Sequence, residues 1–384
     1  MSIWNPRHGR MSSVGSVLAG TVLATLMLSS CGVAGSKDKN ASNGEPIASE
    51  CPSQLNSYLS AGPTMPVTTA MFTSIPKELG YWDEVGPEVK SDRESGGNLA
   101  LVQRFAAADG IDIAGLTGTG ALLLSNQGKE FKGILATVPV NFNTVRVLAS
   151  SDVRTAADLA GKRIGVLDPE SSSVPLIKGM LKSNGIDSKS VSFVGVGIGQ
   201  TALKALLDGQ VDALGLYDSA WAPDGLWPDG YREVMAKDAA KIGPGVMAVV
   251  RHETLRDCKD ELIEYGKAIV KATLFAQENP KMAVRIHWKH YPETKPAGVD
   301  EAEALKTSVD ILERRTDLYV KVDGLWGDVS PEMWQASIDN AIDGGVLDES
   351  IDVDKVWDSS LVKAMNEFDE AELRETARNY VLAQ

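Results

Sequence analysis

The chain has 384 residues, with 52 acidic and 38 basic side chains and a formal net charge of −14 at pH 7. A negative charge of this size argues against nucleic acid and against an anionic membrane face as partners, because both would repel the chain. The length is sufficient for two lobes of ordinary domain size behind a leader segment.

Residues 1–30 have the pattern of a lipoprotein signal peptide. Arg7 and Arg10 give a basic start, and Val14 to Leu28 is an apolar run too short to span a membrane comfortably. Cys31 follows Leu-Ser-Ser, which is similar to a bacterial lipobox. We therefore expect lipid on Cys31 to anchor the protein on the extracytoplasmic side of the cell membrane. The alternative is an ordinary signal peptide followed by a chance cysteine.

Residues 31–60 are predicted to form a flexible tether, because Gly35 to Glu50 is rich in Gly, Ser, Asn and charge and has no apolar period. Beyond Cys31 the chain contains only Cys51 and Cys258. In an oxidising compartment two remaining cysteines suggest one disulfide, although both could equally be buried and free.

From Met65 onward, apolar runs alternate with Gly-, Ser- or Thr-rich turns and with helical segments. Repeated strand–turn–helix units predict an α/β fold with parallel-rich sheets flanked by helices. In the first part of this region we expect strands over residues 65–71, 88–90, 111–115, 131–138 and 144–150.

The stretch from Ser151 to Leu181 predicts a short helix that ends at Gly161, a buried strand, and a second helix that begins near three serines. Further strands are expected over residues 163–167, 191–196, 211–216 and 231–234, and a strand over 246–251 could return to the first lobe. Helices are expected over residues 253–278, 301–318, 331–343 and 367–382. These elements predict lobe 1 over residues 61–148 and 246–384, with a helical C-terminal part, and lobe 2 over residues 149–245.

Three segments resemble a known family in their order and spacing. They are Leu79 to Val89 (LGYWDEVGPEV), Asp158 to Val166 (DLAGKRIGV) and Ala205 to Leu214 (ALLDGQVDAL), and together they resemble the NMT1/SsuA/TauA-like solute-binding proteins of ABC importers. The resemblance implies a two-lobed periplasmic-binding-protein-like fold of type II that closes on a small solute like a hinge. It also implies a monomer that hands its solute to ABC permease and ATPase subunits, without catalysis or a cofactor.

Two other classes of function stay open. Some relatives of this group are desulfinases or take part in pyrimidine synthesis, so an enzyme on the same fold is the alternative, and a sensory binding module is a third possibility. The sequence contains no G-x-S-x-G, H-E-x-x-H or G-x-x-x-x-G-K-[ST] motif. His287 and His290 lie three residues apart, but no acid or cysteine is spaced with them as a metal site requires, so we predict no metal. The glycines of Gly195 to Gly199 are a weak match to a dinucleotide motif and more typical of a tight turn.

Several turns at predicted helix starts are candidates for solute binding, because free backbone N–H groups and hydroxyls there suit a polar or anionic group. Plain helix capping would explain any one of them. The candidate residues are Ser95, Gly96, Gly97, Thr117, Thr119, Ser171, Ser172, Ser173 and Gln200.

Tyr217 and Asp218 follow the strand over residues 211–216, where the resembling family usually places a residue of the cleft. The carboxylate of Asp218 would pair with an amine or a ring nitrogen, or would simply cap a helix, and Tyr217 with Phe72 would stack on a flat ligand. The expected solute is therefore a sulfonate, a carboxylate, a zwitterion or a heteroaromatic compound.

Overall fold

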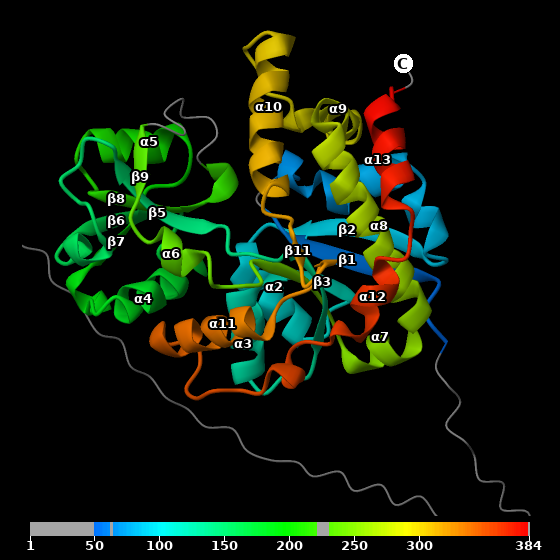
Figure 1. The fold of residues 1–384 in the computed structure, drawn as a ribbon, viewed down its shortest axis with the longest axis horizontal. Helices are drawn as coiled ribbons and strands as arrows, with labels where there is room; N and C mark the ends of the chain where they lie inside the picture. The colour runs from blue at the N-terminus through cyan, green and yellow to red at the C-terminus, as the bar shows by residue number, and fades with distance from the viewer. Residues whose placement is uncertain (1–49, 62–63, 221–229, 383–384) are drawn as a thin grey trace, which may run out of the picture. The chain divides into compact units, whose positions relative to one another are not determined.

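The computed structural model describes residues 50–61, 64–220 and 230–382 (Figure 1). The predicted signal peptide, the lipidation site Cys31 and most of the predicted tether lie outside these ranges. Within the described ranges, no helix combines the length and the apolar character that crossing a bilayer requires.

The first sheet has the strand order β2-β1-β3-β10-β4. β1 runs parallel to both β2 and β3, whereas β10 is antiparallel to β3 and β4. β10 follows the second sheet in the sequence and inserts between the earlier strands β3 and β4, so the chain returns to the first sheet as expected. The strands are β1 (Gln54–Ser60), β2 (Glu88–Glu94), β3 (Ile113–Thr117), β4 (Lys132–Val138) and β10 (Val246–Val250).

The second sheet has the order β7-β6-β8-β5-β9. Its strands β6, β7 and β8 are parallel, and β5 pairs antiparallel with β8 and β9. The strands are β5 (Asn143–Leu148), β6 (Arg163–Val166), β7 (Ser192–Gly195), β8 (Ala213–Tyr217) and β9 (Tyr231–Glu233). We use lobe 1 and lobe 2 for the first and second sheets with the helices packed on each.

Helices flank both sheets, and those after β10 form the helical C-terminal part (Figure 1). α8, α9 and η1 share one apolar core with the first sheet, and α11 shares a second core with β3, α2 and α3. A short hairpin of β11 (Lys321–Val322) and β12 (Leu325–Trp326) precedes α11. The helices are α1 (Ser74–Glu78), α2 (Gly97–Ala106), α3 (Gly118–Asn126), α4 (Ser173–Ser183), α5 (Gln200–Leu207), α6 (Ala236–Ala239), α7 (His252–Asp257), α8 (Lys259–Glu278), α9 (Pro280–His290), α10 (Glu301–Thr316), α11 (Pro331–Asp343), α12 (Val362–Met365) and α13 (Glu370–Asn379), together with the short 3-10 helix η1 (Val67–Phe72).

Three expectations from the sequence are wrong in detail. Residues 54–60 form the interior strand β1 rather than the end of a tether, because Leu55 is fully buried and both edges of the strand are paired. Residues 143–148 form β5 and so belong to the second sheet, not to lobe 1. The predicted strand over residues 65–71 is largely the 3-10 helix η1, in which both the amide and the hydroxyl of Thr69 donate to the Pro66 carbonyl.

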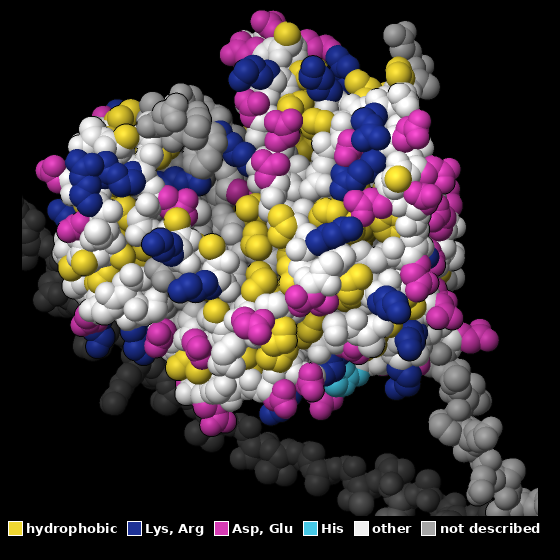
Figure 2. Space-filling model, in the orientation of Figure 1, with side chains coloured by type: hydrophobic (Ala, Val, Ile, Leu, Met, Phe, Trp, Pro, Cys, Tyr) yellow, Lys and Arg dark blue, Asp and Glu magenta, His cyan; other side chains and the backbone are white. Residues whose placement is uncertain are grey.

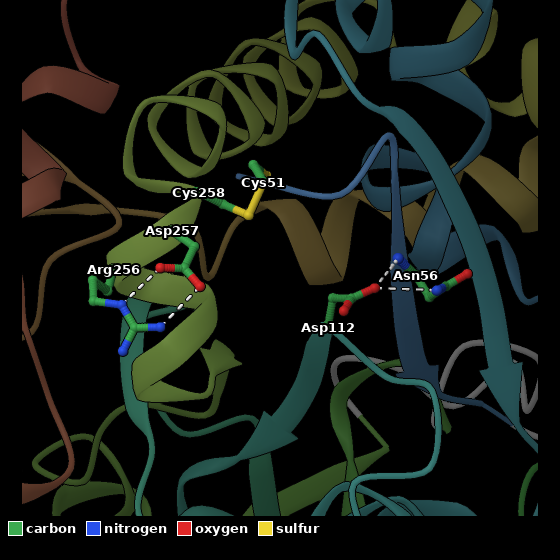
Figure 3. Close-up of a disulfide and its surroundings, with 6 residues drawn as sticks. All are labelled: Cys51, Asn56, Asp112, Arg256, Asp257 and Cys258. Carbon is green, nitrogen blue, oxygen red and sulfur yellow. Dashed lines mark hydrogen bonds and ion pairs between the residues drawn. A yellow bond between two sulfur atoms is a disulfide. The ribbon is translucent and has the colours of Figure 1, made fainter. Parts of the chain in front are cut away.

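A disulfide joins Cys51, just before β1, to Cys258, at the start of α8 (Figure 3). The two cysteines are 207 residues apart in the sequence. Close to them, the Asp112 carboxylate accepts hydrogen bonds from the backbone and the side chain of Asn56 at 2.8 and 3.1 Å (Figure 3). The start of β1 is therefore attached to α8 by the disulfide and to the residue before β3 by these hydrogen bonds.

Charged side chains of both signs are interspersed on the face shown in Figure 2. On the exposed side of α10, for example, Lys306 pairs with Asp310 at 3.0 Å. Positive charges in such pairs are neutralised locally, and exposed pairs of this kind contribute little to stability.

Candidate functional site

A small cavity lies where the two lobes meet. The space that the centres of water molecules can occupy in it is about 20 Å³, which is enough for one or two waters. Its walls come from α3 in lobe 1, α4 in lobe 2, both connections between the sheets, and α11. The lining residues are Thr117, Gly118, Thr119, Leu122, Asn141, Asn143, Ser172, Leu176, Ile242, Pro244, Gly245, Ser337 and Asn340.

The two connections between the sheets form one side of this cavity. They are held together by a hydrogen bond from the Asn141 amide to the Ile242 carbonyl, at 2.9 Å. Side chains at Gly243 and Gly245 would collide with the carbonyls of Pro139 and Val140, so glycine at both positions allows the two backbones to lie in contact. Any movement of one lobe relative to the other has to bend these two segments.

The start of α3 contributes Thr117 and Thr119. Thr117 is the N-cap residue, and its hydroxyl accepts from the Gly120 amide at 3.0 Å and donates to the Asn98 side chain at 2.8 Å. The helix therefore uses Thr117 for its own capping. The Thr119 hydroxyl makes no hydrogen bond within the described ranges and is left to face the cavity.

The start of α4 contributes Ser172. Ser171 and Ser173 hydrogen-bond to each other through their hydroxyls at 2.9 Å, so these two side chains satisfy one another. The Ser172 hydroxyl neither caps the helix nor bonds to another described residue. Of the three predicted serines, Ser172 is the one that lines the cavity.

Asn143, at the start of β5, is a buried polar residue of the cavity lining. It is only 8% exposed, yet its side-chain amide has no hydrogen-bond partner among the described residues. A side-chain amide that no described residue engages can donate to and accept from a polar group in the cavity. Asn143 is therefore a candidate donor and acceptor for a ligand in the cavity.

Helix α11, from the C-terminal part, forms a further wall of the cavity. The Ser337 hydroxyl donates to the Gly243 carbonyl at 2.5 Å, and the Asn340 side chain donates to the Leu176 carbonyl at 3.2 Å. α11 thus contacts a connection between the lobes and α4 at the same time. Sequence analysis missed Asn141, Asn143, Ser337 and Asn340, because no local pattern distinguishes them from other polar residues.

The other predicted site residues lie outside the cavity lining. Phe72 is 6% exposed in the core of lobe 1, where apolar neighbours surround it. Ser95 and Gly96 form the exposed turn before α2, which starts at Gly97, and the Gly96 amide donates to Glu94. Gln200 begins α5 after the tight turn that ends β7.

Tyr217 and Asp218 lie at the edge of the site rather than in its lining. The Asp218 carboxylate is already paired, because Arg315 from α10 donates to both of its oxygens at 2.7 Å. Burial raises the pKa of Tyr217, an effect that Asp218 adds to and Arg315 opposes. Sequence analysis missed Arg315, which lies 97 residues away from its partner.

The histidines considered as metal ligands have structural roles instead. The two ring nitrogens of His287 bond to the Ser74 hydroxyl at 3.0 Å and to the Met65 carbonyl at 2.9 Å. Burial lowers the pKa of His287 to about 4. His290 bonds to the Glu78 carboxylate at 2.8 Å. Across the part of the chain that the structure describes, no group of three or more His, Cys, Asp or Glu is arranged to hold a metal ion.

Solved structures of solute-binding proteins share this fold. The alkanesulfonate-binding protein SsuA from Xanthomonas axonopodis pv. citri, bound to MOPS, aligns over 81% of this chain and 99% of its own, with a TM-score of 0.58 and 16% identity. The periplasmic aliphatic sulphonate-binding protein SsuA from Escherichia coli aligns over 80% of this chain and 93% of its own, with a TM-score of 0.58 and 14% identity. The chain therefore has a two-lobed periplasmic-binding-protein-like fold.

Sequence relatives point the same way. A protein of Brucella abortus (strain 2308) described as a binding protein is 30% identical over 211 residues, which is 49% of this chain and 64% of that protein. The match thus spans just under two thirds of the relative's length. The model of the family described as "NMT1/THI5 like" matches residues 68–283, more than half of the chain. The chain belongs to the NMT1/THI5-like family.

Proposed function

We propose that the protein is a lipid-anchored, extracytoplasmic solute-binding protein of an ABC importer, which captures a small organic solute between its two lobes. One observation carries this proposal: side-chain polar groups with no hydrogen-bond partner among the described residues converge on one cavity from both lobes. Thr119 comes from lobe 1, and Ser172 and Asn143 come from lobe 2. Each lobe alone offers few hydrogen bonds, so tight binding requires both lobes together.

The size of the cavity supports a mechanism in which the lobes open and close. A space of about 20 Å³ for water centres is far too small for an organic solute, since ligand pockets usually measure roughly 300–1,000 Å³. The lobes must therefore separate before a solute enters, and the paired connections beside Gly243 and Gly245 are the place to bend. Capture then needs only a higher affinity of the solute for the closed state.

The chemistry of the lining supports binding rather than catalysis. Among the described residues that line the cavity, none carries an ionisable side chain. The lining hydroxyls would become nucleophiles only with a general base beside them, and no described lining residue supplies one. Asp218, which lies outside the lining, is already paired with Arg315. Hydroxyl, amide and apolar groups instead suit recognition of a solute that leaves unchanged.

We expect lipid on Cys31 to anchor the protein, because two or more acyl chains hold a soluble domain at a membrane stably. Cys31→Ser should release the protein from the membrane fraction of an expressing bacterium, whereas the unchanged chain should partition into detergent. Lys306→Gln is the control, since Lys306 is exposed on α10 and its replacement should leave partitioning intact. Freely soluble or unprocessed wild-type protein would contradict the anchor.

A thermal-shift screen tests solute binding itself. The panel contains sulfonates, carboxylates, zwitterions and heteroaromatic compounds, with sulfonates first because structurally similar proteins are named as sulfonate-binding. A true ligand at 100 times its dissociation constant should stabilise the protein by about 2.7 kcal/mol. Asn143→Ala should weaken binding by about tenfold or more with little loss of stability, because its side chain bonds to no described residue. If no class of solute stabilises the wild type, solute capture is wrong.

A further inference from the structure

One buried ion pair joins the two lobes at the edge of the cavity. Arg315 lies in the last turn of α10 on the lobe 1 side, and Asp218 directly follows β8 of lobe 2. The guanidinium donates to both carboxylate oxygens at 2.7 Å, and the two side chains are only 12% and 9% exposed. The contact can exist only while the lobes are together.

Two aromatic side chains lie beside this ion pair. The Arg315 guanidinium lies 4.8 Å from the centre of the Phe142 ring, and Phe142 meets the ring of Tyr217 edge-on at 6.5 Å. Phe142 stands between Asn141 and Asn143, both of which line the cavity. The Asp218 backbone amide donates to the Phe142 carbonyl at 2.9 Å, so the ion pair is attached to the segment that lines the cavity.

The geometry of the pair is that of an anion site with a carboxylate already in it. A planar guanidinium beside an aromatic ring presents two parallel N–H donors, which fit a carboxylate or a sulfonate equally well. A buried ion pair gains little over an apolar contact, because the loss of hydration offsets the attraction. Stability alone is thus a weak reason for placing these two charges between the lobes.

Charge balance decides which kind of solute can use the site. A purely anionic solute on Arg315 would leave Asp218 as a second, unpaired negative charge in a buried place. A purely cationic solute on Asp218 would leave Arg315 unpaired. A zwitterion keeps the site neutral, since its anionic group replaces Asp218 on Arg315 and its ammonium group replaces Arg315 on Asp218.

We propose that Arg315 and Asp218 are the two charged ends of the solute site and that the solute is a small zwitterion, which inserts into their ion pair. This inference rests on the proposed solute-binding function and specifies its ligand class. Arg315 is the anion anchor and Asp218 the ammonium anchor. In the solute-free closed form, the Asp218 carboxylate occupies the place of the solute's anionic group, and the Arg315 guanidinium occupies the place of its ammonium group.

Matched sets of probes test the inference on the wild-type protein. Each set contains an aminoalkanesulfonate, the alkanesulfonate and the alkylamine of the same length, from two to six carbons, titrated by calorimetry. For at least one length, the aminoalkanesulfonate should bind at least about tenfold more tightly than both partners, because each end forms hydrogen bonds to a charged group. A parallel set of amino acids, carboxylates and amines covers carboxylate-bearing zwitterions.

Variants then assign the two ends. Asp218→Asn should remove the preference for an ammonium group, and Arg315→Gln should remove the preference for an anionic group. Lys306→Gln on the exposed side of α10 is the control, since it breaks the exposed pair with Asp310 and should leave affinity unchanged. Arg315→Lys and Asp218→Glu keep the charges and should retain the preference for zwitterions, although more weakly.

The possible results separate the two levels of the proposal. If the anion or the amine binds as tightly as the zwitterion, or if both neutral variants keep the wild-type preference, the pair is only a contact between lobes and the inference is wrong. If only solutes without a zwitterion bind in the wider panel, the inference fails while solute capture stands. If no organic solute binds, the proposed function fails first and the inference fails with it.

Discussion

His287 illustrates how a buried polar side chain is explained only by its three-dimensional partners. A carbonyl can only accept, so the His287 nitrogen facing the Met65 carbonyl donates, and the other nitrogen accepts from Ser74. Both nitrogens are therefore used by a neutral ring. The sequence could indicate that a metal site was weakly supported here, but it could not supply these partners, which lie more than 200 residues away.

The pKa of His287 predicts how stability depends on pH. Burial lowers it to about 4 in the folded protein, against about 6.5 in an unfolded chain. Between these values the unfolded state binds more protons, so the stabilisation is complete above about pH 6.5 and is lost as the pH falls towards 4. His287 should account for a loss on the order of 3 kcal/mol over this window.

Urea denaturation at pH 7, 5.5 and 4.5 measures this effect. His287→Gln should be less stable than the wild type at pH 7 but should lose less stability on acidification. His252→Gln is the control, because His252 is exposed. Equal pH slopes for the wild type and His287→Gln would contradict the assignment.

Among the helices and strands, the sequence correctly predicted those whose own residues show a clear apolar pattern. The expected helix over residues 331–343 is α11, and the returning strand β10 lies between β3 and β4. The interior strand β1 escaped prediction because its apolar alternation is weak. Leu55 is apolar, but the next inward residue, Ser57, is polar and hydrogen-bonds to Tyr265. Such a strand is specified by its neighbours rather than by its own pattern.

The candidate site was predicted only in part, for a related reason. Thr119 and Ser172 lie at helix starts, which the local sequence can indicate. Asn143 reaches the site from the start of β5, and Ser337 and Arg315 come from the C-terminal helices α11 and α10. Nothing in their local sequence indicates that these segments meet, because tertiary packing alone brings them together.

The contact between α4 and α11 gives a prediction at this scale. Gly179 of α4 faces the backbone carbonyl of Asn340 in α11, and an added Cβ would collide with it. Gly179→Ala would normally favour a helix, but here we expect a net loss of about 1–3 kcal/mol from overpacking. Urea denaturation measures the change.

Lys182→Ala, one turn further along α4, is the control for Gly179→Ala. Lys182 is 59% exposed and pairs with Asp343, so its loss should cost less than about 1 kcal/mol. A Gly179→Ala protein as stable as the wild type would show that the two helices separate without cost.

For the whole molecule, the sequence correctly predicted an α/β protein of two sheets with a helical C-terminal part. The alternation of strand and helix segments, and the order and spacing of the three family-like segments, supported that prediction. The boundary between the lobes was misplaced because β5 is an ordinary apolar strand, and only its pairing with β8 assigns it to the second sheet. The lobes are joined by two connections, by α11 and by the Arg315–Asp218 pair.

Hydrogen–deuterium exchange with and without a solute identified by the thermal-shift screen tests capture between the lobes most directly. We predict slower exchange in four segments together: residues 117–120, 139–143, 172–176 and 243–245. These segments surround one cavity but belong to both lobes and both connections, and solute-stabilised closure should protect all of them. Protection confined to one lobe, or to a surface such as α13, would contradict capture between the lobes.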